Sequence, residues 1–210
     1  MEIIYQGAES IIYLSEYDNQ RVLVKERIRK EYRVPQLDDE LRKTRTKKEV
    51  KLLTEVRKLG IFTPTIYHVD EKESKIMMEF IDGVMLKNHL NEIPEEEIKS
   101  ICFELGKIIG KLHSHDIVHG DLTTSNMILK DGKIYLIDFS LGDFTKRIES
   151  KGVDLKLLRD ALKSTHFKIL SLAWESILEG YRKEYKNSAD VLEQLKKIEQ
   201  RVRYANRESG

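Results

Sequence analysis

The chain has 210 residues, of which 35% are charged and 40% hydrophobic, with 37 lysines and arginines against 36 aspartates and glutamates. This near balance gives no overall attraction to nucleic acid or to a membrane surface, and no apolar run approaches the roughly 18 residues of a transmembrane helix. The single cysteine, Cys102, excludes a disulfide within the chain, and its apolar neighbours predict a core residue rather than a nucleophile. The N-terminus lacks a signal-peptide pattern, so we expect a soluble, cytoplasmic protein.

The first part of the chain predicts a small antiparallel β-sheet. Gly7 lies in the first expected turn, and Lys25 ends the third expected strand, where a buried strand would direct its ammonium group into a cleft. Apolar and β-branched runs separated by turn residues indicate strands at 3–5, 11–14, 21–25, 65–69 and 75–80. Residues 78–83 then lead into a helix-rich second half.

One helix is expected between these strands. Residues 26–40 read as a polar connection interrupted by Pro35, and a helix then runs from about residue 41 to 59, where Gly60 caps it. Its buried face is marked at helical spacing by Val50, Leu53 and Val56.

The second half predicts mainly helices. Pro94 and the three glutamates after it are typical of a helix start, and that helix runs to about His115. The other expected helices lie at 84–90, 153–166, 167–186 and about 189–203. One face of the helix expected at 167–186 carries an apolar stripe that we interpret as part of the core: Phe167, Leu170, Trp174, Ile177 and Tyr181.

Two features admit more than one interpretation. His113, His115 and His119 lie close in sequence, but no cysteine or acid is spaced to complete a zinc site, so we interpret His119 as a structural loop residue and the others as ordinary. Residues 25–58 carry 13 basic against 7 acidic side chains, and residues 182–207 carry 8 against 4. Solvated helix faces explain either run, although an RNA partner stays open.

The most informative stretch is His119-Gly120-Asp121 with Asn126, followed further along the chain by Asp138-Phe139-Ser140. Between them lie a strand, a turn at Asp131-Gly132 and a second strand, a hairpin that would bring Asp121, Asn126 and Asp138 close together. Two carboxylates and an amide suit Mg²⁺, which needs only one or two carboxylates. The remaining carboxylate, Asp121, is then free to accept a proton or orient a water. The bland alternative is an ordinary β-hairpin with polar flanks.

This pattern, H-G-D-x-x-x-x-N followed by D-F-x, resembles the catalytic and metal loops of protein kinases and their relatives. The resemblance implies that Asp121 is the catalytic base and that Asn126 and Asp138 bind Mg²⁺. It also implies that Lys25 grips the phosphates of ATP. Glu49 on the expected helix is the candidate ion-pair partner of Lys25, and Glu55 is the alternative.

The same resemblance places the rest of an ATP site. Ile4 to Ile12 would cover the phosphates, although Gly7 is the only glycine of three expected there. Charge alone, rather than the resemblance, suggests that Glu9 pairs with Lys25 when nucleotide is absent. The backbone of residues 78–83 would form the hinge that binds adenine. The implied ATP-binding set is Ile4, Gln6, Gly7, Ala8, Glu9, Ser10, Ile12, Lys25, Glu49, Glu79 and Ile81.

The combined pattern is an α+β, minimal bilobal protein-kinase-like fold: a small antiparallel β lobe with one helix (1–81) and a truncated helical lobe (82–210), the latter with a catalytic loop at 119–126 and a metal loop at 138–142. Nearly the whole chain resembles the small atypical kinase/ATPase subunit of the KEOPS complex. The motifs that carry this resemblance are Gln6–Ser10, Tyr32–Asp38, Gly60 with Pro64, His119–Asn126, and Arg201 with Arg203. Ser140 departs from the usual D-F-G.

The resemblance implies ATP and Mg²⁺ as cofactors, Ser/Thr protein kinase activity in isolation, and an ATPase role in forming threonylcarbamoyladenosine next to the anticodon of tRNA. It implies an ASKHA-fold threonylcarbamoyl transferase as direct partner, a small subunit on the β lobe, and leaves tRNA contact through the basic last helix and tail open. Thr123 and Ser125 stand where protein kinases commonly place a cation, which favours hydrolysis or slow transfer.

Two rival functions remain. A small-molecule kinase of the aminoglycoside or choline type also uses H-G-D-x-x-x-x-N, but the stretch that follows Gly142 is too short for its usual acceptor pocket. A pseudokinase scaffold is disfavoured by the presence of Lys25, Asp121, Asn126 and Asp138.

Overall fold

The computed structural model describes the backbone of residues 2–208 and the side chains as far as Arg201. The chain forms two compact units, which are described separately. The first comprises the residues up to Asp82 together with Tyr135–Ser140, and the second comprises Gly83–Ile134 and the residues from Leu141 onward. From the sequence alone, residues 135–140 were expected in the second lobe.

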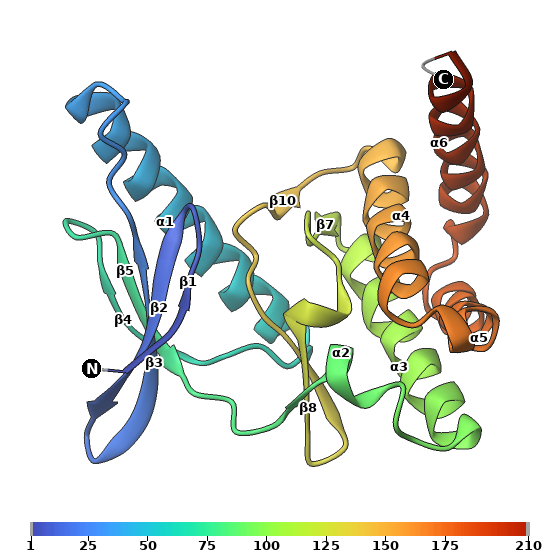
Figure 1. Ribbon diagram of the computed structural model, residues 1–210, viewed down its shortest axis with the longest axis horizontal. Helices are drawn as coiled ribbons and strands as arrows, with labels where there is room; N and C mark the ends of the chain where they lie inside the picture. Colours follow the sequence, from blue (N-terminus) through green and yellow to red (C-terminus); the bar gives the residue numbers. More distant parts are fainter. Residues whose placement is uncertain (1, 209–210) are drawn as a thin grey trace. The chain divides into compact units, whose positions relative to one another are not determined.

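The first unit contains a five-stranded antiparallel sheet (Figure 1). The three strands expected before residue 26 are present, and a tight turn with positive φ at Asp18 (50°) and Asn19 (58°) joins the second and third. The strand order is β1-β2-β3-β5-β4. The strands are β1 (Glu2–Gln6), β2 (Ser10–Tyr17), β3 (Gln20–Arg27), β4 (Ile66–Asp70) and β5 (Lys75–Glu79).

Helix α1 (Pro35–Lys58) belongs to the same unit as this sheet. The sequence predicted that this helix starts at about residue 41, but it begins at Pro35. Pro35 was interpreted as a break, but it occupies the first turn, where a fixed φ is favourable and the missing N–H costs nothing. Ion pairs four residues apart, such as Lys43 with Asp39 at 2.6 Å, support the early turns. Gly60 ends the helix with φ of 77°, as expected.

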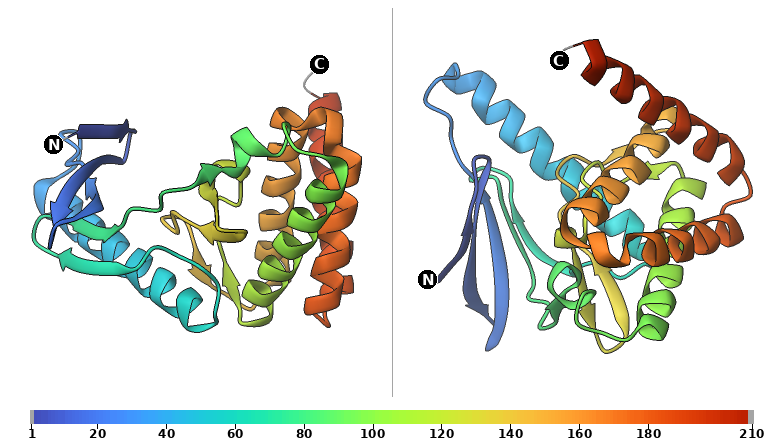
Figure 2. Two further views of the ribbon diagram at one scale, coloured as in Figure 1. Left: turned by 90° about the horizontal axis from the view of Figure 1, so that it is seen from below. Right: turned by 45° about the vertical axis from the view of Figure 1, so that its right-hand side comes forward.

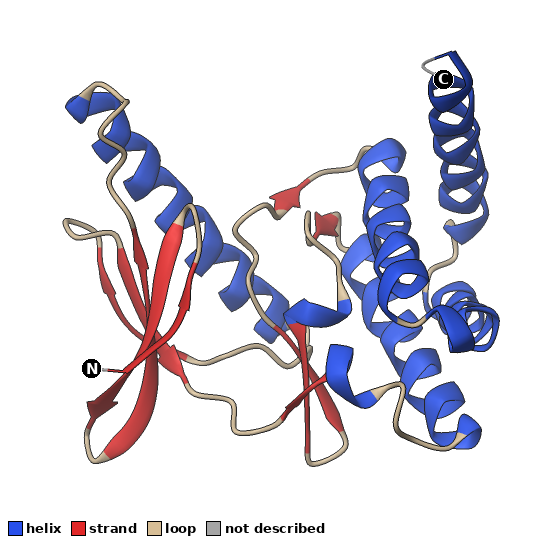
Figure 3. Ribbon diagram, in the orientation of Figure 1, coloured by secondary structure: helices blue, strands red, loops and turns tan. Residues whose placement is uncertain are grey.

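The second unit is mainly helical (Figures 2 and 3). Its helices are α2 (Leu86–His89), α3 (Glu95–Ser114), α4 (Ile148–Thr165), α5 (Leu170–Glu184) and α6 (Ser188–Glu208). Short strands β7 (Ile117–Val118) and β10 (Asp143–Phe144) pair with each other. A second small sheet has the order β6-β8-β9, formed by β6 (Val84–Met85), β8 (Met127–Lys130) and β9 (Lys133–Leu136), and the last two residues of β9 are counted with the first unit.

Helices α3 and α5 approach until their backbones touch. A Cβ atom added to Gly106 would lie 2.1 Å from the carbonyl oxygen of Ile177, and one added to Gly180 would lie 2.0 Å from that of Phe103. Only glycine fits at such a crossing. Helices α3 and α5 are therefore tightly packed against each other in the core of the second unit.

The predicted apolar stripe of α5 is partly wrong. Ile177 and Tyr181 are fully buried as expected, but Phe167 is 73% exposed. Phe167 belongs to a 3-10 turn (Phe167–Ile169) that precedes the helix, so the helical phase does not extend back to it. Within the described residues, no helix is both long and apolar enough to cross a membrane.

Candidate active site

Lys25 lies near the end of β3 and is 3% exposed. Its Nζ donates to Glu49 Oε1 at 2.7 Å, to Asp138 Oδ1 at 2.7 Å and to Ser140 Oγ at 2.8 Å. Glu49, on the buried face of α1, is the ion-pair partner that the sequence favoured. The alternative, Glu55, pairs instead with Lys58 at the surface.

A second cation, Arg27, binds the same glutamate. Arg27 follows Lys25 by two residues, so both side chains leave one face of β3. Its Nη2 donates to Glu49 Oε2 at 2.5 Å, and Ser140 Oγ also donates to that oxygen, at 3.2 Å. Sequence reasoning missed Arg27, although the two-residue strand period after Lys25 was a usable signal.

Asp138 adopts a strained backbone conformation with φ of 61°, which is uncommon for a residue other than glycine. Burial alone would raise the pKa of its carboxyl. The charge of Lys25 and hydrogen bonds from Lys25 and Ser140 outweigh burial and lower the pKa to about 2. Asp138 is therefore ionised throughout the neutral range, which is the form in which a carboxylate binds a metal ion.

The expected pairing of Glu9 with Lys25 is wrong. Glu9 Oε2 accepts from Arg45 Nη1 at 2.6 Å, and Glu9 Oε1 lies 3.8 Å from Arg33 Nη2. Lys25 already has Glu49 and Asp138, whereas the two arginines reach the β1–β2 turn that carries Glu9. That turn is closed by a hydrogen bond from Gly7 N–H to Ser10 O at 2.9 Å.

The predicted hinge residues have structural contacts. Glu79 Oε2 accepts from Thr65 N–H at 3.1 Å and from Thr65 Oγ1 at 2.8 Å, and Ile81 is buried. Adenine binding by their backbone, like nucleotide contact by Ile4, Gln6, Ala8, Ser10 and Ile12, stays a prediction.

In the second unit, the loop before β8 brings Asp121 and Asn126 together. Asn126 Nδ2 donates to Asp121 Oδ2 at 2.8 Å and to the backbone oxygen of Asp121 at 2.9 Å. A 3-10 turn (Thr124–Asn126) holds the asparagine, with Asn126 N–H bonded to Thr123 O. The loop therefore presents one carboxylate and one oriented amide at the start of β8.

Asp154 of α4 fixes this loop and was not identified from the sequence. Its Oδ2 accepts from the backbone N–H of His119 at 2.6 Å, and its Oδ1 accepts from Gly120 N–H at 2.8 Å. Asp154 is 1% exposed, and His119 is fully buried. His119 is thus structural, as expected. No signal in the sequence marks Asp154, because it lies far beyond the loop along the chain, on a helix of its own.

His113 is a core residue rather than an ordinary surface histidine. It is fully buried, with Nδ1 2.8 Å from Tyr181 Oη and Nε2 3.5 Å from Asp154 Oδ2. Burial lowers the pKa of His113, although Asp154 partly offsets this effect. For the Cys102 thiol, whose charged form is the thiolate, burial instead raises the pKa, to about 12, consistent with the predicted core role. Among the described residues, no three His, Cys, Asp or Glu side chains are grouped to hold a metal ion.

Comparison with a solved structure and with a family model identifies the fold and the family of the chain. A solved structure of WaaP in complex with acyl carrier protein matches 96% of this chain and 88% of its own, with a TM-score of 0.64 and 13% identity. This likeness concerns the fold alone, which is protein-kinase-like and of the expected α+β class. A family model described as the RIO domain matches residues 11–142.

Proteins of similar sequence then identify the group within this family to which the chain belongs. The chain is 46% identical to the KEOPS complex subunit Bud32 of Pyrococcus abyssi, over 99% of this chain and 98% of that protein. It is 42% identical to a probable bifunctional tRNA threonylcarbamoyladenosine biosynthesis protein of Methanobrevibacter smithii, of which it spans 37%. The chain therefore belongs to the RIO-domain family, and within it to the group that includes Bud32.

Proposed function

We propose that the chain is an ATP- and magnesium-dependent atypical Ser/Thr protein kinase and ATPase that acts as a KEOPS subunit in forming threonylcarbamoyladenosine in tRNA. The single observation that carries the enzymatic part is the buried group in which Lys25 contacts both Glu49 and Asp138 at 2.7 Å. The similarity to Bud32 supports the biological role.

The residues present fit the two cofactors. Lys25 supplies a buried ammonium group for phosphate, and Glu49 fixes its position. The ionised Asp138 supplies a hard oxygen ligand, and Asn126 directs its Nδ2 to Asp121, which leaves its amide oxygen for a cation. When bound, Mg²⁺ neutralises charge on the phosphates of ATP.

Asp121 is the proposed base. Its Oδ2 accepts from Asn126, so Oδ1 can accept a proton from a hydroxyl group or orient a water. Thr123 and Ser125 add no positive charge to the loop, so a transferring phosphoryl group receives less stabilisation there. This favours slow transfer and hydrolysis. Peptide phosphorylation at about 10 s⁻¹, within the ordinary kinase range, would contradict it.

The proposed partners are an ASKHA-fold threonylcarbamoyl transferase, a small subunit on the β unit, and tRNA near the end of α6. Arg201 on α6 is exposed and pairs with Glu149 at 3.2 Å, whereas the side chain of Arg203 lies outside the described residues. If both arginines contact tRNA, replacing them by alanine should weaken tRNA binding and flatten its dependence on salt. An unchanged slope would remove both from the interface.

ATP turnover tests the proposal directly. Phosphate release should be measured with Mg²⁺ for the wild type, Asp121→Asn and Asp138→Asn, with and without the transferase and tRNA. Each substitution should reduce turnover by about 10²-fold or more, because one removes the base and the other a metal ligand. Asp190→Asn, at an exposed position on α6, is the matched control and should retain full turnover.

The outcomes separate the candidate functions. Turnover that needs both aspartates and rises with the transferase supports a coupled ATPase. Partner-independent transfer to serine with little free phosphate would identify mainly a protein kinase, and transfer to a small hydroxylated molecule a small-molecule kinase. Nucleotide binding without turnover in any mixture would leave a pseudokinase scaffold.

A further inference from the structure

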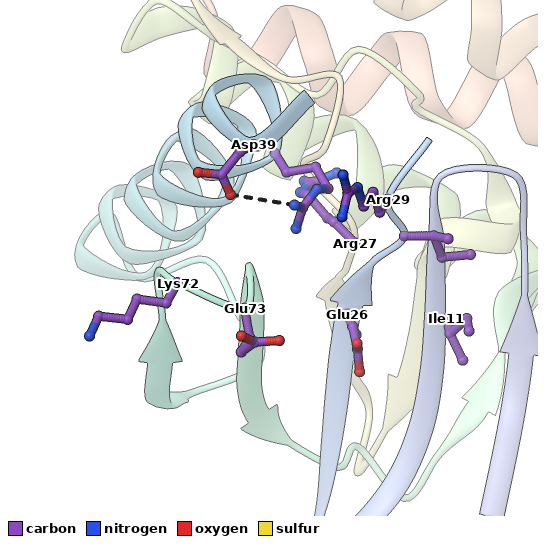
Figure 4. Close-up of a pocket in the computed structure, with 9 residues that line it drawn as sticks. Ile11, Glu26, Arg27, Arg29, Asp39, Lys72 and Glu73 are labelled. Carbon is purple, nitrogen blue, oxygen red and sulfur yellow. Dashed lines mark hydrogen bonds and ion pairs between the residues drawn. The ribbon is translucent and has the colours of Figure 1, made fainter. Parts of the chain in front are cut away.

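A pocket and a chain of hydrogen bonds lie outside the proposed contacts with ATP and metal. The pocket, of about 410 Å³, belongs to the first unit and is lined by basic and acidic side chains (Figure 4). Two of its arginines are already paired, Arg27 with Glu49 at 2.5 Å and Arg42 with Asp39 at 3.4 Å, so the pocket favours no charged ligand. The chain of hydrogen bonds lies at the end of α4 in the second unit, and it reaches the loop that carries Asp121.

His166, directly after α4, is the centre of this chain and is fully buried. Its backbone N–H donates to Leu162 O at 2.7 Å, and its carbonyl oxygen accepts from Ile169 N–H at 3.1 Å. Two side chains then hold the ring: Nδ1 lies 2.9 Å from Asn91 Oδ1, between α2 and α3, and Nε2 lies 3.1 Å from Thr124 Oγ1. The imidazole therefore has a fixed position and a partner on each nitrogen.

The contacts of Asn91 define which ring nitrogen of His166 carries the proton. Asn91 Nδ2 donates to the backbone oxygen of Thr165 at 3.1 Å, so Oδ1 faces the ring, and an amide oxygen can only accept. Burial lowers the pKa of His166, and the charge of Lys87 lowers it further, so the ring is neutral at pH 7. Nδ1 therefore carries the proton, and the Thr124 hydroxyl donates to Nε2.

Thr124 lies between Asp121 and Asn126 and is 1% exposed. It begins the 3-10 turn that ends at Asn126, and this turn is closed by the bond from Asn126 N–H to Thr123 O at 3.0 Å. Within the described contacts, the side chain of Thr123 gives the turn no capping bond. A single 3-10 turn has little rigidity of its own. Its orientation therefore depends on contacts from elsewhere, such as the bond from Thr124 to His166.

We propose that His166 is a positioning residue for the proposed reaction. Through Thr124 it fixes the 3-10 turn, so that Asn126 keeps its bond to Asp121 and its amide oxygen stays available to Mg²⁺. Asp154, in the first half of α4, holds the start of the same loop, and His166 holds its end. The consequence for turnover rests on the proposed function, whereas the hydrogen-bond chain itself does not.

The test compares Thr124→Val with Thr124→Ser in the whole chain. Valine has no hydroxyl and leaves Nε2 of His166 without its donor, whereas serine keeps this donor. Thr124→Val should move the Asn126 side-chain amide resonances and lower ATP turnover per folded molecule about tenfold or more, because small misplacements of reacting groups are costly. Thr124→Ser should retain turnover within about threefold, because it restores the hydroxyl. Circular dichroism gives the folded fraction.

A second pair of variants acts from outside the loop. Asn91→Ala removes the acceptor of the His166 Nδ1–H group at an exposed position. It should lower the population of the Nδ1-protonated ring, which ¹⁵N NMR reads from the two ring nitrogens, and it should also move the Asn126 amide resonances. Asn187→Ala, at another exposed asparagine of the second unit, is the matched control and should leave both unchanged.

The spectra are recorded without nucleotide or Mg²⁺, so they do not depend on the proposed function. A wild-type His166 ring protonated at Nε2 instead of Nδ1 would overturn the proposal. In an active protein, equal turnover of Thr124→Val and Thr124→Ser would also overturn it. If the wild type hydrolyses ATP and Thr124→Val leaves the Asn126 resonances in place, only this inference fails. If those resonances move and the wild type has no turnover, only the proposed function fails.

Discussion

The loop that carries Asp121 depends on one carboxylate from another part of the chain, and the substitution Asp154→Ala is the sharpest test of how this loop is held. Both oxygens of Asp154 accept backbone N–H groups, from His119 at 2.6 Å and Gly120 at 2.8 Å. Alanine would leave both donors without this acceptor in a site where Asp154 is only 1% exposed.

The expected loss follows from these two bonds. Leaving a buried donor unsatisfied costs about 1–3 kcal/mol, and Gly120 is only partly buried, so the free energy of unfolding should fall by about 2–5 kcal/mol. Asp154→Asn keeps one acceptor oxygen and directs an NH₂ group at the other donor. Its loss should therefore be intermediate.

Urea denaturation followed by circular dichroism measures the effect. Asp160→Ala, on the same helix, removes an exposed carboxylate whose ion pair is with Lys156, and it should cost less than about 1 kcal/mol. A loss below about 1 kcal/mol for Asp154→Ala would refute the reasoning. ATP turnover by the folded fraction should also fall, because the loop backbone that carries Asp121 is no longer fixed.

Three further predictions concern the helical unit. Burial lowers the pKa of His113, so the stability that this residue contributes is present above pH 6.5 and is lost on acidification; the free energy of unfolding should fall by up to about 1.4 kcal/mol per pH unit. Urea denaturation from pH 7.5 to 5 should show this loss, and His113→Gln should reduce the dependence of the free energy of unfolding on pH. Gly106→Ala would place a Cβ 2.1 Å from Ile177 O and should cost about 3 kcal/mol or more, whereas the nearest atom to a Cβ at Gly152 is the end of the Ile198 side chain at 3.0 Å, so Gly152→Ala should cost far less; equal thermal shifts for the two would contradict this packing. The Cys102 thiol, whose pKa is raised to about 12, should react with iodoacetamide only as the chain unfolds, and rapid labelling of the native protein would disprove its burial.

The local motifs were predictable from the sequence because they depend on neighbouring residues. A lysine that ends a β-branched run, a glycine after a helical stripe, and the short spacing from Asp121 to Asn126 each indicate a conformation or a chemistry by themselves. The Lys25–Glu49 pair was predictable only through the resemblance to kinases. Nothing in the spacing of two residues 24 positions apart requires their contact.

The remaining features depend on tertiary contacts. Arg27 binds Glu49 because the side of α1 that carries Glu49 faces the side of β3 that carries Arg27. The sequence of neither segment alone predicts that these two sides face each other. Pro35 can end a helix or begin one, and the preceding chain conformation decides which. The stripe through Phe167 failed because a single 3-10 turn shifts the phase of the side chains. Glu9 was assigned by charge alone, without knowledge that α1 offers Arg45 to the β1–β2 turn.

The position of Asp154 has a practical consequence for dissecting this protein. The segment that matches the RIO-domain model ends at residue 142, whereas the side chain that orients the backbone at His119 and Gly120 lies beyond that boundary, on α4. A fragment that starts at the first residue and ends at residue 142 would keep every residue proposed to touch ATP or metal. It would nevertheless lose the carboxylate that holds the backbone of the loop carrying Asp121. The smallest working unit therefore extends at least through α4, beyond the motifs that reveal the family.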